Sequence, residues 1–121
     1  MKTILCVDDS TTVLLSLTAI LGKAGYAAEK ASSGDDALSR LKSGLKPDLI
    51  ITDLNMPGMN GIEFIKQVRL LPSLRFVPIL FLTTESQQSK RAEAKAAGAS
   101  GWLVKPVNGD ELLNTIKLVA R

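Results

Sequence analysis

The sequence predicts an α/β fold in which helices cover both faces of a parallel sheet. Short apolar runs alternate along the chain with longer segments whose apolar residues recur at helical spacing. Three of these runs are apolar at consecutive positions, as strands buried on both faces require. Five strands that alternate with five helices indicate βαβ units. The 121 residues suit one compact domain.

The predicted strands differ in how apolar they are. The first, third and fourth are nearly continuous apolar runs, and the fourth reads "VPILFLTT". The second, "YAAEKA", is weakly apolar, and the fifth, "WLVK", is short. In chain order, we expect strands at 4–7, 26–31, 49–52, 77–84 and 102–105.

The predicted helices are bounded by recognisable residues. Ser10 or Thr11 can cap the first helix, and Gly25 can end it. Pro72 should stop the third helix, and Gly98 should terminate the polar, alanine-rich fourth helix. In chain order, we expect helices between 10 and 25, within 32–44, and over 62–71, 86–98 and 108–120.

The composition is that of a soluble globular domain, with 45% hydrophobic and 22% charged residues. No apolar run approaches the roughly 18 residues that span a membrane. The apolar run near the start of the chain is too short for a signal peptide. We therefore expect a cytoplasmic protein with no membrane insertion. Cys6 is the only cysteine, inside an apolar run, and the absence of histidine speaks against a catalytic thiol.

The net charge of +3 is a mild excess of 15 basic over 12 acidic residues. Nucleic-acid binding usually requires a concentrated basic surface. Here lysine and arginine are scattered, and the densest group, Lys90, Arg91 and Lys95, is spaced like a solvated helix face. We expect no nucleic-acid partner.

Polar residues stand at the ends of four predicted strands. Asp8 and Asp9 follow the first strand, Asp53 ends the third, Thr83 ends the fourth and Lys105 ends the fifth. In open α/β sheets, ligands bind at the carboxyl ends of the strands. The fold would therefore bring three carboxylates, a hydroxyl and an ammonium to one place.

The three carboxylates, Asp8, Asp9 and Asp53, predict a Mg²⁺ site. Packed together they repel one another, and a hard divalent cation with a preference for oxygen ligands removes that conflict. The alternative is that Asp8 and Asp9 only cap the first helix.

Lys105 and Thr83 indicate a phosphoryl group on the neighbouring carboxylate. An ammonium and a hydroxyl both suit phosphate oxygens, and aspartate can be a nucleophile that forms an aspartyl phosphate. The alternatives are a salt bridge from Lys105 to Asp53 alone, and a threonine chosen for its β propensity.

The motifs "VDDS" (7–10), "ITDLNMPGMNG" (51–61), "FLTTES" (81–86) and "GWLVKP" (101–106) occur in order and with matching spacing. On these motifs the whole chain closely resembles the response-regulator receiver domains, especially the single-domain CheY-like proteins. The resemblance implies a flavodoxin-like, doubly wound (βα)5 three-layer sandwich with strand order 2-1-3-4-5. It also implies a single receiver domain over residues 1–121, and we expect no output domain.

The resemblance assigns the metal and phosphoryl chemistry to matching positions. Asp53 is the implied phosphoacceptor. Asp9, Asp53 and the backbone carbonyl of Asn55 would bind Mg²⁺ directly, and Asp8 would help through water. Asn55 and Glu85 occupy positions that tune hydrolysis of the phosphoryl group in relatives, so we expect a short-lived phosphoryl state.

The resemblance also implies a switch. Thr83 would turn toward the phosphoryl group, Lys105 would contact it, and the bond before Pro106 would be cis. Trp102 stands where relatives usually have Tyr or Phe. It would move inward with Thr83 and alter the surface of the fourth helix, fifth strand and fifth helix. Its alternative role is that of a partly exposed apolar residue on a sheet edge.

The function implied is a phosphorylation-dependent signalling switch of a two-component system. A histidine kinase would donate the phosphoryl group to Asp53, and the altered surface would regulate a downstream protein, with chemotaxis as the leading process. We expect a monomer that catalyses only its own phosphorylation and dephosphorylation, not an enzyme that turns over a metabolite.

Five alternatives stay open. The domain could be a phosphate sink or phosphorelay shuttle, or a receiver that only scaffolds partners. A Mg²⁺-dependent aspartyl-phosphate phosphatase would want a second aspartate where Asn55 stands. A flavodoxin-like nucleotide binder would want a hydroxyl- or glycine-rich loop after the first strand, where this chain has Asp8 and Asp9.

Overall fold

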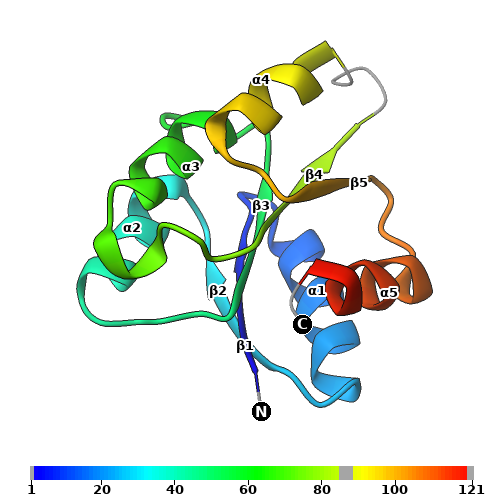
Figure 1. The fold of residues 1–121 in the computed structure, drawn as a ribbon. Helices are drawn as coiled ribbons and strands as arrows, with labels where there is room; N and C mark the ends of the chain where they lie inside the picture. The colour runs from blue at the N-terminus through cyan, green and yellow to red at the C-terminus, as the bar shows by residue number, and fades with distance from the viewer. Residues whose placement is uncertain (1, 85–88, 120–121) are drawn as a thin grey trace.

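The structure, a computed structural model, describes residues 2–84 and 89–119. Within them, five strands form one parallel sheet in the order β2-β1-β3-β4-β5 (Figure 1). This confirms the flavodoxin-like α/β fold and its strand order. The strands are β1 (Thr3–Val7), β2 (Ala27–Ala31), β3 (Leu49–Asp53), β4 (Ile79–Thr83) and β5 (Gly101–Val104).

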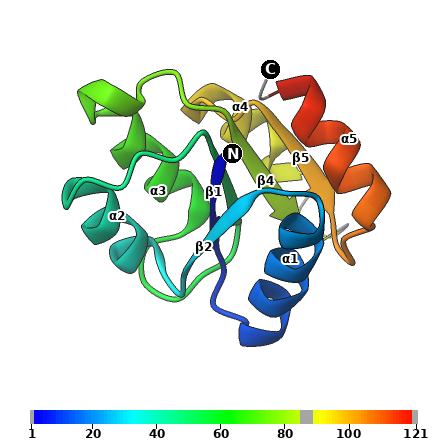
Figure 2. The ribbon, with the colours of Figure 1, turned by 90° about the horizontal axis from the view of Figure 1, so that it is seen from below.

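Helices cover both faces of the sheet and complete the three layers. Helices α1 and α5 lie on one face, and α2, α3 and α4 lie on the other (Figure 2). Among the described residues, none of the helices combines the length and apolar character that a membrane crossing requires. The helices are α1 (Thr11–Lys23), α2 (Gly34–Lys42), α3 (Gly61–Arg69), α4 (Arg91–Ala97) and α5 (Gly109–Val119), with a short 3-10 helix, η1 (Pro72–Leu74).

The strands carry side chains into two separate cores, one under each helical layer. In β1, Leu5 and Val7 are buried in the core under α2, α3 and α4, whereas Ile4 and Cys6 are buried in the core under α1 and α5. Successive side chains of a strand point to opposite faces, so both positions of each pair are apolar. This explains the continuous apolar runs of β1, β3 and β4.

Two helix boundaries differ from the predictions. Helix α3 ends at Arg69 rather than at 71, because Leu71 precedes Pro72 and has extended backbone (φ −80°, ψ 118°). Proline disfavours the α conformation in the residue before it. Helix α4 begins at Arg91, within the predicted span of 86–98, of which residues 86–88 lie outside the described part.

The predicted caps of the first and fourth helices are confirmed. The Ser10 hydroxyl accepts the backbone N–H of Val13 and caps α1. Gly98 ends α4 with a φ of 111°, in the left-handed region that favours glycine.

Arg69 connects three parts of the chain at the end of the sheet where β4 begins. Its guanidinium donates hydrogen bonds to the carbonyls of Leu74 (3.1 Å), Val77 (2.7 Å) and Gly98 (2.6 Å). These contacts tie the end of α3 to the segment before β4 and to the residue that follows α4. The planar guanidinium has the several donors that such a three-way connection needs.

Candidate functional site

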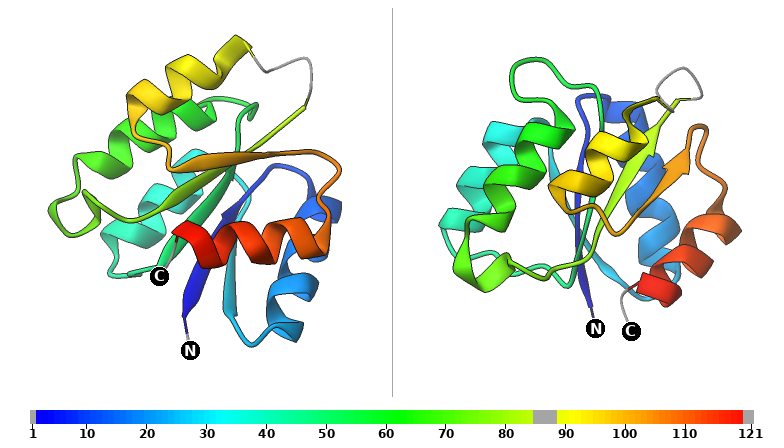
Figure 3. Two further views of the ribbon diagram at one scale, coloured as in Figure 1. Left: turned by 45° about the vertical axis from the view of Figure 1, so that its right-hand side comes forward. Right: turned by 45° about the horizontal axis from the view of Figure 1, so that its top comes forward.

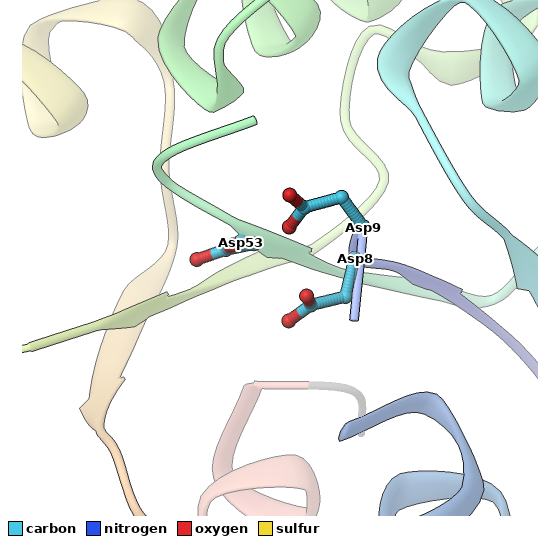
Figure 4. Close-up of side chains that lie close together, drawn as sticks. All are labelled: Asp8, Asp9 and Asp53. Atoms are coloured by element: carbon cyan, nitrogen blue, oxygen red, sulfur yellow. The ribbon is translucent and has the colours of Figure 1, made fainter. Parts of the chain in front are cut away.

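The carboxyl ends of the central strands bring three aspartates together. Asp53 is the last residue of β3, and Asp8 and Asp9 directly follow the neighbouring strand β1. Their carboxylates turn toward a common space (Figure 4). One carboxylate oxygen from each residue lies within 4.8 Å of the others. The structure therefore brings together the predicted acidic cluster.

The three carboxylates have different surroundings. Asp8 is fully buried and Asp53 is 5% exposed, whereas Asp9 is exposed. Asp8 Oδ1 accepts the backbone N–H of Ser10 at 2.9 Å, which fixes the turn into α1. The helix cap itself is Ser10, so capping of α1 leaves the position of Asp9 and the second oxygen of Asp8 unexplained.

Lys105 supplies a cation to this cluster from the end of β5. Its Nζ lies 3.1 Å from Oδ1 of Asp53 and 3.2 Å from Oδ2 of Asp8. Its backbone N–H donates to the carbonyl of Thr83 at 2.7 Å, and the Lys105–Pro106 peptide bond is cis, as the resemblance implied. The salt bridge to Asp53 that the alternative supposed is present, and Lys105 contacts the Asp8 carboxylate as well, so the contact of Lys105 with a phosphoryl group stays a prediction.

The protonation equilibria reflect both burial and crowding. Burial raises the pKa of Asp53 and the charge of Asp8 raises it further, against the hydrogen bond and charge of Lys105. Burial lowers the pKa of Lys105, but its contacts with Asp53 and Asp8 outweigh that effect and leave its pKa raised. One ammonium thus faces three carboxylates, and the cluster retains an excess of negative charge.

The residues of the cluster fit a hard divalent cation. Their donors are oxygens, they converge from two adjacent strands, and the repulsion between them is only partly offset by Lys105. Mg²⁺ prefers oxygen donors and is commonly bound by one or two carboxylates together with other oxygens.

The loop after β3 contains Asn55, which is exposed and stands two residues after Asp53. The loop is closed by a hydrogen bond of 2.9 Å from the Gly61 N–H to the Leu54 carbonyl, and Gly58 provides a positive φ of 76°. A role for the Asn55 carbonyl in metal binding stays a prediction. Glu85, the other residue expected to tune hydrolysis, lies outside the described residues.

Thr83 is the last residue of β4, which neighbours β3, and Trp102 lies on the adjacent strand β5. Thr83 is 3% exposed, and its hydroxyl donates a long hydrogen bond of 3.5 Å to the Leu103 carbonyl. Trp102, the preceding residue on β5, is half-buried and packs against the core under α2, α3 and α4. Strand β5 is an edge strand, as the alternative role of Trp102 supposed.

Arg91 is a residue of this region that the sequence-based reasoning missed. Its guanidinium carbon lies 4.5 Å from the centroid of the Trp102 ring. The interpretation of Lys90, Arg91 and Lys95 as one solvated helix face is therefore wrong for Arg91, which is half-buried. No sequence signal identifies this contact, because it depends on where α4 lies against β5.

The fold and the acidic cluster define a flavodoxin-like α/β protein whose candidate functional site lies at the carboxyl edge of the sheet. The profile of the response regulator receiver domain matches residues 4–117. Protein PilH of Pseudomonas aeruginosa is 37% identical over 119 residues, which cover 98% of each chain. The chain therefore belongs to the response regulator receiver domain family, whose members are signalling switches of two-component systems.

Solved structures agree with this assignment. Chemotaxis protein CheY4 of Vibrio cholerae has a TM-score of 0.93 and 45% identity, over 98% of both chains. The receiver domain of a sensor histidine kinase from Pseudomonas aeruginosa has a TM-score of 0.89 and 27% identity, over 98% of this chain and 97% of its own. That structure has a magnesium ion coordinated in its active-site cleft.

Proposed function

We propose that this protein is a phosphorylation-dependent switch in which Asp53 accepts a phosphoryl group from a histidine kinase. The observation that carries the proposal is the contact of 3.1 Å between the Lys105 ammonium and the Asp53 carboxylate, beside Asp8 and Asp9. The ammonium on one oxygen of this buried carboxylate offsets negative charge that accumulates during the transfer. The two further carboxylates suit the binding of a metal ion that adds positive charge at the same place.

Mg²⁺ is the proposed cofactor. Asp9, Asp53 and the Asn55 backbone carbonyl would bind it, and Asp8 would contribute through water. When bound, the ion offsets the charge of the phosphoryl oxygens. The relative with magnesium in its active-site cleft supports this proposal, as does the fit of the oxygen donors described above.

The proposed transfer is a displacement at phosphorus. An oxygen of the Asp53 carboxylate forms a bond to the phosphorus of a phosphohistidine while the P–N bond breaks. The histidine ring keeps the electron pair and takes a proton from solvent. Asp53 must be ionised for this attack, and the ammonium of Lys105 favours that form although burial opposes it. Hydrolysis of the resulting acyl phosphate, which Asn55 and Glu85 tune, resets the switch.

The response to phosphorylation is proposed to pass through Thr83. Its hydroxyl exchanges a weak hydrogen bond to the Leu103 carbonyl for a phosphoryl oxygen, and Trp102 moves with it. The α4-β5-α5 face then changes and regulates a downstream protein. Similarity to CheY4 supports a role in chemotaxis. We further propose a cytoplasmic, monomeric protein.

Trp102 fluorescence tests the proposal, because Trp102 is the only tryptophan. The protein is titrated with beryllofluoride, which mimics a phosphoryl group, in the presence of Mg²⁺, and separately incubated with acetyl phosphate. We expect a saturable, Mg²⁺-dependent response in wild type and in the control Asp110→Asn, which changes an exposed carboxylate of α5. Asp53→Asn should not respond.

Two results would overturn the proposed function. One is a wild-type protein that does not respond to beryllofluoride and Mg²⁺, and the other is an equal response from Asp53→Asn. Steady phosphate release from small phosphomonoesters would instead favour the phosphatase alternative.

A further inference from the structure

Arg91 and Trp102 form a stacked pair between the first turn of α4 and strand β5. The guanidinium carbon of Arg91 lies 4.5 Å from the ring centroid, and both side chains are half-buried. In Figure 3, α4 lies beside α3, and its first turn is the end of the helix that is nearer to the carboxyl end of β4. The pair joins a helix and a strand of the face proposed to change on phosphorylation.

The Nε of Arg91 is the second observation. It is buried and has no hydrogen-bond partner within residues 2–84 and 89–119. A buried N–H without a partner is unfavourable, because it has lost its hydrogen bonds to water. The stack over Trp102 therefore keeps the guanidinium in a place that leaves one of its donors unsatisfied.

We propose that Arg91 is a positioning residue that holds Trp102 in its resting place and so sets how readily the switch operates. This inference rests on the proposed function, since it takes Trp102 as the moving residue. The attraction between a guanidinium and the face of an indole ring increases as the pair loses contact with water. The unsatisfied Nε acts in the opposite direction, because the donor regains water or a partner when the ring moves away.

The stack stabilises the resting position of Trp102, and the unsatisfied Nε reduces that stabilisation. The free energy that separates the resting state from the moved state is therefore small. Trp102 adjoins Leu103, whose carbonyl accepts the Thr83 hydroxyl, so movement of Thr83 is transmitted to the strand that carries the ring. Among residues 2–84 and 89–119, no side chain caps α4 at Lys90. Because Arg91 stacks on Trp102, a movement of the ring should also move the first turn of α4.

Linkage gives the measurable consequence. A ligand at Asp53 that favours the moved state must supply the free energy that separates it from the resting state. If Arg91 stabilises the resting state, its removal reduces that free energy and the ligand binds with higher apparent affinity. Loss of a positive charge alone predicts the reverse, because an anionic ligand would then bind more weakly.

Beryllofluoride titration at saturating Mg²⁺ separates these effects in Arg91→Ala, Arg91→Lys and the control Lys90→Ala. Lys90 is the neighbouring residue, is well exposed and pairs only with Glu93 at 3.6 Å among the ion pairs of the described residues. We expect the midpoint for Arg91→Ala to fall about fivefold, from the usual strength of such a stack. Arg91→Lys should fall less, and Lys90→Ala should match wild type.

Acrylamide quenching of Trp102 without ligand gives a readout that a general loss of stability would not produce. Arg91→Ala should raise the quenching constant, because it uncovers one face of the ring. The circular dichroism spectra and thermal midpoints of all variants establish that each is folded, and Arg91→Lys provides a second, milder variant.

The outcomes distinguish this inference from the proposed function. A wild-type response with an unchanged or higher midpoint in Arg91→Ala overturns the role of Arg91 and leaves the proposed function standing. An equal fall in Lys90→Ala also overturns it. A wild type that does not respond overturns the proposed function, and the role of Arg91 with it.

Discussion

The ammonium of Lys105 lies 3.1 Å from a carboxylate oxygen of Asp53, and the two residues come from non-adjacent strands, β5 and β3. Strand β4 separates them, so the contact crosses the carboxyl edge of the sheet above Thr83. In the protein without ligand, the Lys105 ammonium therefore already places a positive charge beside the carboxylates at which Mg²⁺ and a phosphoryl group are proposed to bind. Its contribution to stability and its relation to Mg²⁺ can be measured separately.

Lys105→Met should destabilise the protein in Mg²⁺-free buffer by about 2 kcal/mol, because it removes hydrogen bonds to two buried carboxylates. The thermal midpoint should fall by roughly 8 °C for a domain of this size. Added Mg²⁺ should restore more stability to the variant than to wild type, since the ion replaces the missing positive charge. Thermal unfolding with and without Mg²⁺ measures both effects.

The matched control is Lys117→Met, which removes an exposed lysine on α5. It should change the midpoint little. Equal destabilisation by the two substitutions would contradict a specific role for the Lys105 ammonium.

Asp53→Asn should raise stability at pH 7 in Mg²⁺-free buffer, by about 1 kcal/mol or roughly 4 °C. The pKa of Asp53 is raised above 3.8, first by burial and then by Asp8. The folded state therefore holds this proton more tightly than the unfolded chain does. Stability from Asp53 is present in acid and is lost as the pH rises from the unfolded pKa through the folded pKa.

The difference between Asp53→Asn and wild type should accordingly disappear in acid, where both side chains are neutral. Thermal midpoints over a pH series check this. A variant that is less stable than wild type at pH 7 would show that the pair with Lys105 outweighs burial and repulsion.

Gly61→Ala should destabilise the protein by about 3 kcal/mol. A Cβ at this position would overlap the Asp53 carbonyl oxygen and would lie 2.6 Å from Cε1 of Phe81 and 3.0 Å from the Cα of Leu54. Because two of these neighbours are backbone, the cost includes displacement of Asp53 and a weaker response to beryllofluoride. Urea unfolding and the fluorescence titration measure the two effects.

Gly22→Ala is the control for that substitution. Gly22 lies within α1, and a Cβ there would meet nothing within 4 Å. We expect a gain of about 0.5–1 kcal/mol, the usual advantage of alanine over glycine in a helix. Destabilisation by both substitutions would indicate that crowding at Gly61 is not the cause.

Cys6 should react very slowly with iodoacetamide in the folded protein. Its side chain is fully buried, and burial raises the pKa of the thiol to about 12. At pH 9, labelling should therefore be fast in urea, where a thiol has a pKa of about 8.5, and should stay very slow under native conditions. Mass spectrometry measures the labelled fraction, and rapid native labelling would contradict the buried position.

The acidic cluster could be predicted because the carboxyl ends of parallel strands all lie at the same edge of the sheet. Once Asp8, Asp53 and Lys105 are assigned to strand ends, the sheet itself brings them together. Errors of one or two residues in the predicted strand boundaries do not change which side chains meet at this edge. Lys105 lies just beyond β5 rather than at its last position, and it still reaches Asp53.

The contact between Arg91 and Trp102 could not be predicted in this way. It depends on the position of a short helix against an edge strand, and neither the alanine-rich pattern nor the charge spacing contains that information. The end of α3 could have been placed better, because Pro72 restricts Leu71 as well as its own position.

The hydrogen bond of 2.6 Å from Arg69 to the Gly98 carbonyl has a consequence for how α4 can move. The far end of the helix is anchored to α3 and to the segment before β4, whereas its first turn is joined to β5 through an aromatic ring. A displacement of that ring should therefore rotate α4 about its anchored end at Gly98. The largest excursion would occur at Lys90 and Arg91, and the helix would tilt rather than slide.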